Sequence, residues 1–157
     1  MPIKSHHYVD AKNIESDLAA FMQAIIQIPS LSSKEGAVIE RIRAEMLRVG
    51  FDEVTIDPMG NLIGRIGSGP FVIALDGHAD TVDTGDLSLW DRNPHSGDME
   101  DGVIYGRGAS DQKGGIASAV YAGALLKKTG IPDEITLYVT ATVQEEDCDG
   151  LCWQYIV

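Results

Sequence analysis

Residues 71–80 read FVIALDGHAD, and this stretch decides the fold. The run from Phe71 to Leu75 is apolar and of strand length, which predicts a strand covered on both faces. It leads into His78 and Asp80, whose side chains leave on the same face if the extended conformation continues. One of the two can bind a metal while the other orients it, although a histidine at a strand end is also often purely structural.

A second strand is expected at residues 134–143, where apolar residues alternate with threonine and tyrosine. This strand leads directly into Glu145 and Glu146. Neighbouring carboxylates at a strand end point in different directions, so one can coordinate a cation while the other accepts a proton. Acidic residues after a strand also simply solvate a turn, and both interpretations stay open for this pair.

The other elements follow from apolar periodicity and from glycine and proline positions. A helix is expected in residues 13–28 and a second one up to Val49, with Ser32 or Ser33 as its N-cap. A hairpin is expected in residues 51–70, a long loop in 81–112 and a buried helix in 114–128. This order predicts an α/β fold, a sheet layered with helices, whose ligands bind beyond the carboxyl ends of the strands.

Asp111 lies in a glycine-rich stretch, YGRGASDQKGG at residues 105–115, just ahead of the last expected helix. The glycines permit close approach of the backbone, which suits a ligand site. Asp111 is equally well explained as an ordinary N-cap. The stretch is not a phosphate-binding loop, because Lys113 is followed by Gly114 rather than by serine or threonine.

Charge and composition restrict the class of partner. The chain has 157 residues, of which 44% are hydrophobic, and this fits one domain with a sizeable core. Twelve basic residues against 24 acidic ones give a net charge of -12, which argues against nucleic acid and anionic membranes as partners. A cation fits this balance better, although acidity also serves solubility.

The cysteines and the remaining histidines carry less information. Cys148 and Cys152 are too few for a disulfide scaffold, which indicates a reducing compartment, and we expect the cytoplasm. Their spacing has three intervening residues, so a cysteine metal or redox site is the weaker alternative. His6, His7 and His95 are assigned to surface or loop positions. Residues 1–10 contain no apolar core of signal-peptide length and no stretch of the chain is apolar enough to span a membrane, so we expect neither a signal peptide nor a membrane helix.

Taken together, the motifs GHADTV at residues 77–82, GRGASDQKGG at 106–115 and the pair Glu145 and Glu146 resemble, in this order, the signature of the zinc aminoacylase and metallopeptidase family. That family includes acetylornithine deacetylase, succinyl-diaminopimelate desuccinylase and glutamate carboxypeptidase. The segment DPMGNL at residues 57–62 is similar too. Within the family, the run from Gln144 to Trp153 most resembles the YgeY-type hydrolases linked to selenium metabolism.

The resemblance implies a role for each residue of the candidate site. His78 and Glu146 would each bind one zinc, Asp111 would bridge both, Asp80 would orient His78 and Glu145 would be the general base. Two zinc ions, with cobalt or manganese as alternatives, would activate a shared water to cleave an amide bond in an N-acyl amino acid or short peptide. We also expect a cis peptide between Asp111 and Gln112, and we expect the ligands to lie within about 7 Å of one another.

The chain departs from the family pattern in length. Family members have a further acidic ligand, a late histidine ligand and an inserted domain for dimerisation, so the intact enzyme is expected to be a homodimer. Residues 1–157 are therefore interpreted as the N-terminal part of a zinc-peptidase-like catalytic domain. The alternative is a truncated or pseudoenzyme fragment with an incomplete metal site and no activity by itself.

Overall fold

The computed structural model describes residues 11–148 and 150–156. Its main feature is a four-stranded sheet in the order β1-β2-β6-β3, next to a small two-stranded sheet of β4 and β5. The elements, in chain order, are α2 (Glu15–Ile26), α3 (Gly36–Arg48), β1 (Glu53–Ile56), β2 (Leu62–Gly67), β3 (Phe71–His78), η1 (Leu87–Leu89), β4 (Met99–Glu100), β5 (Val103–Ile104), η2 (Ala109–Lys113), α4 (Gly114–Thr129), β6 (Ile135–Thr142), α5 (Glu145–Cys148) and η3 (Leu151–Tyr155).

The pairing of β3 with β6 determines where the site lies. The two strands run parallel, from Phe71 opposite Ile135 to His78 opposite Thr142, so both end at the same edge of the sheet. Strand β2 pairs antiparallel with the other side of β6 and with β1, which confirms the hairpin expected from the sequence. The α/β fold class, a sheet layered with helices, is likewise confirmed.

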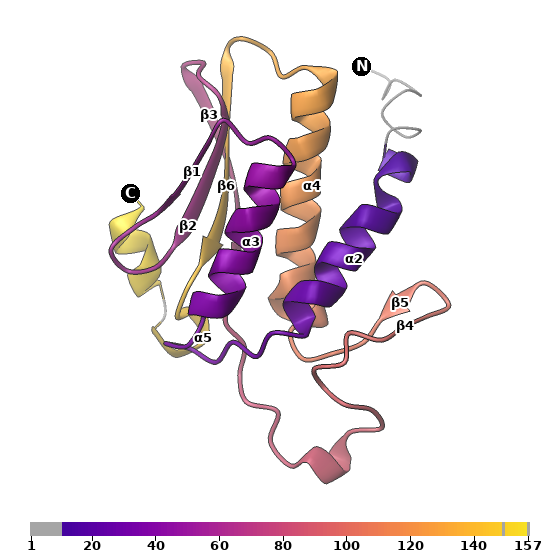
Figure 1. Cartoon of the computed structure of the whole chain (residues 1–157). Coiled ribbons are helices and arrows are strands. Elements are labelled where there is room, and N and C mark those ends of the chain that lie inside the picture. Colours follow the sequence, from indigo (N-terminus) through magenta and orange to yellow (C-terminus); the bar gives the residue numbers. More distant parts are fainter. Residues whose placement is uncertain (1–10, 149, 157) are drawn as a thin grey trace.

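Helices α3 and α4 pack against one side of the sheet and α2 packs on these two helices, while the C-terminal turn η3 lies on the other side beside β1 and β2 (Figure 1). The apolar stripes that the sequence predicts point into this layer. The fully buried core side chains include Phe21, Ile25, Val38, Ile42, Met46, Ile116, Val120 and Val139. Burial of each such side chain contributes roughly 1.5–3 kcal/mol, so the helix layer holds the sheet edge in place.

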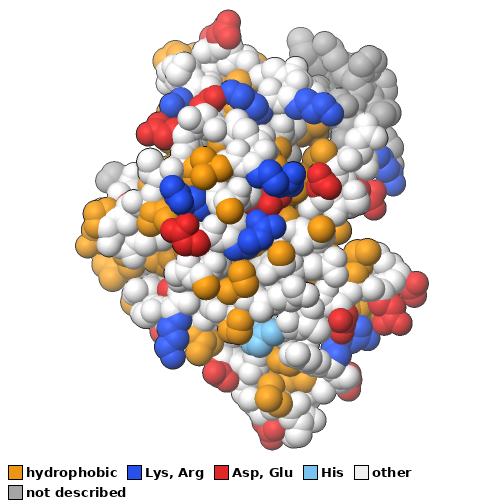
Figure 2. Space-filling model, in the orientation of Figure 1, with side chains coloured by type: hydrophobic (Ala, Val, Ile, Leu, Met, Phe, Trp, Pro, Cys, Tyr) orange, Lys and Arg blue, Asp and Glu red, His pale blue; other side chains and the backbone are white. Residues whose placement is uncertain are grey.

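A buried carboxylate joins helix α3 to helix α4. Glu45 is 2% exposed, and its side chain accepts hydrogen bonds from Arg41, Arg48 and the hydroxyl of Tyr121 at 2.8, 2.5 and 2.7 Å. Burial acts to raise the pKa of Glu45, but these three donors outweigh it and the pKa is lowered. Figure 2 shows basic side chains gathered on this helical face of an otherwise acidic protein.

Two expectations from the sequence are wrong. Strand β3 is not covered on both faces, because the neighbouring residues Phe71 and Val72, whose side chains point to opposite faces, are 68% and 63% exposed. Helix α3 is not capped by Ser32 or Ser33. Its N-cap is Glu35, whose side chain makes no capping hydrogen bond, and the hydroxyl of Ser32 bonds to Asp80 instead.

Within the described part of the chain, no helix combines the length and the apolar character required to cross a bilayer.

Candidate metal centre

His78 is the last residue of β3 and is only 5% exposed. Its Nδ1 lies 3.0 Å from the backbone oxygen of Asp80 and 3.5 Å from Asp80 Oδ1, while Nε2 lies on the side of Asp111 and Glu145. When Nδ1 carries the proton, it donates a hydrogen bond to Asp80, and the lone pair of Nε2 is then available to a cation. Before any cation binds, the Asp80 side chain, opposed by burial and aided by Asp111, raises the pKa of His78 to about 9.

Close packing fixes the backbone on either side of His78. A Cβ at Gly77 would lie 2.8 Å from Gln112 Oε1 and 2.9 Å from Ile116 Cγ1, so a larger residue here would force these two side chains to shift. Gln112 also accepts a hydrogen bond from the backbone amide of His78 at 3.2 Å. Strand β3 and turn η2 are thereby held in contact beside the histidine.

Asp111 lies in turn η2, and its side chain is 76% exposed. Its Oδ1 is 2.8 Å from His78 Nε2. The N-cap of α4 is Lys113, without a side-chain capping bond, so the alternative of Asp111 as an ordinary cap is wrong. The peptide bond from Asp111 to Gln112 is cis, which confirms that prediction.

Glu146 completes a group of three possible ligands. One ligand atom each of His78, Asp111 and Glu146 lies within 4.8 Å of the other two, which confirms the predicted convergence. A nitrogen and two carboxylate oxygens at this separation fit a zinc ion. The neighbouring Glu145 is half-exposed, and its Oε2 lies 3.9 Å from His78 Nε2. Strand β6 ends at Thr142, one residue before the expected end, and both glutamates lie in the short helix α5 that follows.

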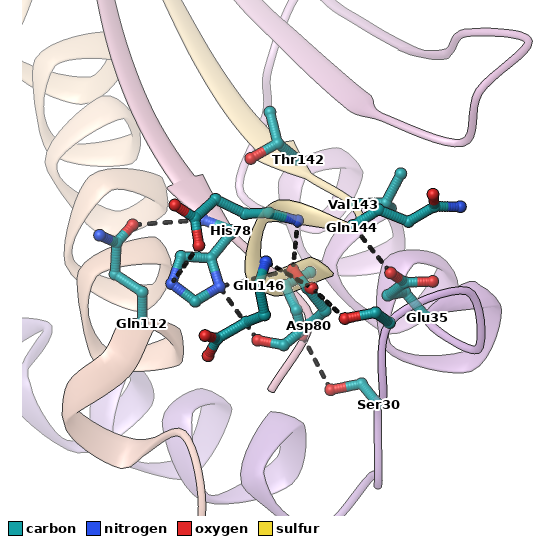
Figure 3. Close-up of polar contacts among 12 residues, drawn as sticks. Ser30, Glu35, His78, Asp80, Gln112, Thr142, Val143, Gln144 and Glu146 are labelled. Carbon is teal, nitrogen blue, oxygen red and sulfur yellow. Dashed lines mark hydrogen bonds and ion pairs between the residues drawn. The ribbon is translucent and has the colours of Figure 1, made fainter. Parts of the chain in front are cut away.

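Asp80 is fully buried at the centre of this arrangement (Figure 3). Its carboxylate accepts hydrogen bonds from the hydroxyl of Ser32 and from the backbone amides of Glu145 and Glu146 at 2.7, 3.2 and 3.1 Å. Burial acts to raise the pKa of Asp80, but hydrogen bonds from His78, Ser32 and the two amides outweigh it, and the pKa is lowered. Asp80 is therefore an ionised acceptor that links the histidine to the glutamate pair.

Sequence reasoning missed Lys113 and Glu35. Lys113 is fully buried and donates from Nζ to the backbone oxygens of Ile25 and Ile28, which ties turn η2 to the end of α2. Burial lowers the pKa of Lys113 to about 8. Glu35 is 5% exposed and contacts the turn before the glutamate pair. A lysine after a glycine-rich stretch and a glutamate before a helix are common on surfaces, so neither position indicated burial.

The other candidate residues lie apart from this group. Cys148 and Cys152 are free thiols, and among the described residues the only group of three possible metal ligands is the one that contains His78. His95 lies in the long loop, where its Nδ1 is buried without a hydrogen-bond partner. His6 and His7 fall outside the described residues.

Sequence comparison identifies a protein family and several relatives that are similar to this chain. The profile of peptidase family M20/M25/M40 matches residues 74–155, which contain all five candidate site residues. The chain is 54% identical over 147 residues to the uncharacterised protein YgeY of Escherichia coli K12, an alignment that covers 94% of the chain and 36% of YgeY. It is 37% identical over 110 residues to succinyl-diaminopimelate desuccinylase of Methylorubrum extorquens, covering 66% of the chain and 29% of that enzyme.

Solved structures share the fold. The di-peptidase Dug1p from Saccharomyces cerevisiae superposes with a TM-score of 0.81 at 20% identity, over 96% of this chain and 36% of that one. Human carnosine dipeptidase 1 superposes with a TM-score of 0.78 at 18% identity, over 97% of this chain and 36% of that one. The chain thus spans about a third of the length of the relatives that it matches.

Proposed function

The chain belongs to peptidase family M20/M25/M40, and on that premise we propose that the intact protein is a metal-dependent hydrolase that cleaves an amide bond. The observation that carries the proposal is the meeting of His78, Asp111 and Glu146 within 4.8 Å at the edge of the sheet. The histidine is already oriented by Asp80, as metal-binding histidines commonly are by carboxylates.

We propose that the site takes two zinc ions, with cobalt or manganese as the alternative metals. His78 would hold one ion, Glu146 would hold the other and Asp111 would contribute a ligand to both. When bound, the ions act as Lewis acids on the scissile carbonyl and make water a nucleophile near neutral pH. The net charge of -12 and the exposed carboxylate of Asp111 favour capture of cations at this edge.

Glu145 is proposed as the general base. Its Oε2 lies beside His78 Nε2 at 3.9 Å, close to the ligands but outside the three ligand atoms that meet. Oε2 accepts a proton from the attacking water as the new C–O bond forms. The same oxygen then returns the proton to the amine nitrogen as the C–N bond breaks, so that one carboxylate serves both halves of the hydrolysis.

The proposed substrates are N-acyl amino acids, as in a deacetylase or desuccinylase, or short peptides. We further propose that the intact protein is a cytoplasmic homodimer that binds neither nucleic acid nor membrane. The free cysteines support the cytoplasm as the compartment. The net charge of -12 supports the absence of nucleic acid and anionic membranes as partners. Three ligands cannot complete two zinc shells of about four ligands each, so we propose that residues 1–157 alone have no turnover.

Metal content and turnover test this proposal together. The intact protein is expected to contain two zinc ions per chain and to hydrolyse at least one member of a panel of N-acyl amino acids and dipeptides, whereas the 157-residue chain binds metal without turnover. A metal-free intact protein that hydrolyses the panel at full rate would refute the metal-dependent mechanism. An intact protein that is loaded with metal but inactive on the whole panel would refute the substrate class.

A further inference from the structure

Four successive backbone amides before and within the glutamate pair donate to side chains from distant parts of the chain. We call residues 143–146 the four-amide segment. The pairs are Val143 with Asn61 Oδ1 at 3.0 Å, Gln144 with Glu35 Oε1 at 2.9 Å, Glu145 with Asp80 Oδ1 at 3.2 Å and Glu146 with Asp80 Oδ2 at 3.1 Å. Side chains, not a neighbouring strand, therefore determine the path of the segment that carries the proposed base and ligand.

Glu35 binds the residue of this segment that has the least favourable backbone conformation, Gln144. Gln144 has φ of +57°, a left-handed conformation that residues with a Cβ rarely adopt. Ser33, with φ of +65°, is left-handed too, and its amide donates to the same oxygen, Glu35 Oε1, at 3.0 Å. One buried carboxylate oxygen therefore stabilises two unfavourable turns that lie 111 positions apart in numbering, at residues 33 and 144.

The carboxylate of Glu35 is not needed by its own helix. Glu35 is the N-cap of α3, but its side chain makes no capping bond to that helix. Glu35 Oε1 points across to Gln144 instead (Figure 3). Glutamate side chains are rarely buried unless a specific interaction requires them, and here the interaction is with the turn that leads to Glu145.

We propose that Glu35 is a positioning residue of the metal centre. It fixes the left-handed turn at Gln144, and this turn directs the amide of Glu145 to Asp80 and the side chain of Glu146 to the other ligands. The inference rests on the proposed function, because it assigns Glu35 to a site whose metal role is itself proposed. It also makes a structural claim that is testable without metal.

The first experiment measures amide hydrogen exchange in the metal-free chain. Glu35→Leu is expected to accelerate exchange at Gln144, Glu145 and Glu146 by about tenfold or more, while the amides of strand β6 keep their rates. Glu35→Gln retains an oxygen that accepts both hydrogen bonds and should exchange like the wild type. The matched control is Glu40→Leu, which removes an exposed glutamate from the same helix. Unchanged exchange at the three amides in folded Glu35→Leu would overturn the inference.

The second experiment measures Zn²⁺ affinity of the same variants by competition with a chromophoric chelator. Loss of a group that orients a ligand weakens metal binding by about 10- to 100-fold, and we expect this for Glu35→Leu but not for Glu35→Gln or Glu40→Leu. A purely structural role for Glu35 would lower the melting temperature and leave the affinity of the folded chain at the wild-type value, which would also overturn the inference.

A second-site change separates positioning from general damage. Glycine adopts left-handed φ without penalty, so Gln144→Gly should recover much of the Zn²⁺ affinity lost in Glu35→Leu. No recovery in the double variant would count against the turn as the link between Glu35 and the ligands. If the wild-type chain binds no Zn²⁺ at all, the proposed function fails by itself, and the exchange rates still decide whether Glu35 holds the turn.

Discussion

The backbone amide of Glu146 donates to Asp80 Oδ2 at 3.1 Å. The carboxylate that contacts the histidine ring therefore also fixes the start of helix α5, where the glutamate pair lies. Two proposed zinc ligands, one at the end of strand β3 and one in helix α5, are thus oriented by one buried side chain. A change at Asp80 should disturb both ligands together.

We expect Asp80→Asn to weaken Zn²⁺ binding by about 10- to 100-fold, the usual effect of altering a carboxylate beside a metal-bound histidine. The amide also replaces one of two acceptor oxygens with a donor, so one of the α5 amides loses its partner. Chelator competition measures the effect. Asp83→Asn, at an exposed aspartate three residues further on, is the control. Equal affinities of the two variants would contradict the role assigned to Asp80.

In the intact enzyme, Glu145→Gln should keep both zinc ions and lose turnover by about a hundredfold to ten-thousandfold, because glutamine keeps the shape of the side chain and lacks its basicity. Elemental analysis and hydrolysis of the best substrate from the panel give the two readouts. Hydrolysis at the wild-type rate would show that Glu145 is not the base.

Asp111→Ala in the intact enzyme should lose metal as well as turnover, since a bridging carboxylate supports both cations. The exposed Asp101, on the same long connection, provides the matched control Asp101→Ala, which should keep its zinc. Zinc content per chain distinguishes the two variants. Retention of two zinc ions by Asp111→Ala would mean that Asp111 does not bridge.

The buried carboxylate of Glu45 should make stability depend on pH in the acid range. Its pKa is lowered in the folded chain, so its stabilising effect is complete above its ordinary value of 4.5 and is lost as the pH falls from there through the folded-state value. Glu45→Gln should therefore cost roughly 1 to 3 kcal/mol at pH 7 and progressively less below about pH 4.5. Urea unfolding of both proteins at pH 7 and pH 3 measures the difference. A constant difference would refute the assignment.

Much of the fold is readable from the sequence because its elements have clear periodicity. The apolar stripes of α2 and α3, the hairpin of β1 and β2 and the buried strand β6 all appear at the expected positions. The burial of β3 was predicted wrongly. An apolar run indicates a strand, but it does not say where in the sheet the strand lies or whether other elements cover its two faces. The pattern is the same for a central and an edge strand.

The site was predictable only in part. The spacing of His78 and Asp80 and the order of the motifs indicated the group that converges, and its geometry is confirmed. The metal roles of these residues stay predictions. Glu35 was not predictable, because its partner Gln144 lies 109 residues away and no local pattern marks a contact of that range. Left-handed φ at a glutamine is equally invisible in the sequence.

The long sequence separation across the site has a consequence for the order of folding. Asp80 and Glu146 are 66 residues apart, and the parallel pairing of β3 with β6 brings them together. Pairing of distant segments is slow compared with the formation of helices such as α2 and α3. We therefore expect Zn²⁺ to leave the refolding rate of the chain unchanged and to slow its unfolding, as stopped-flow kinetics with and without the ion will show. Faster refolding in Zn²⁺ would mean that the cation is captured by the nascent sheet rather than by the finished one.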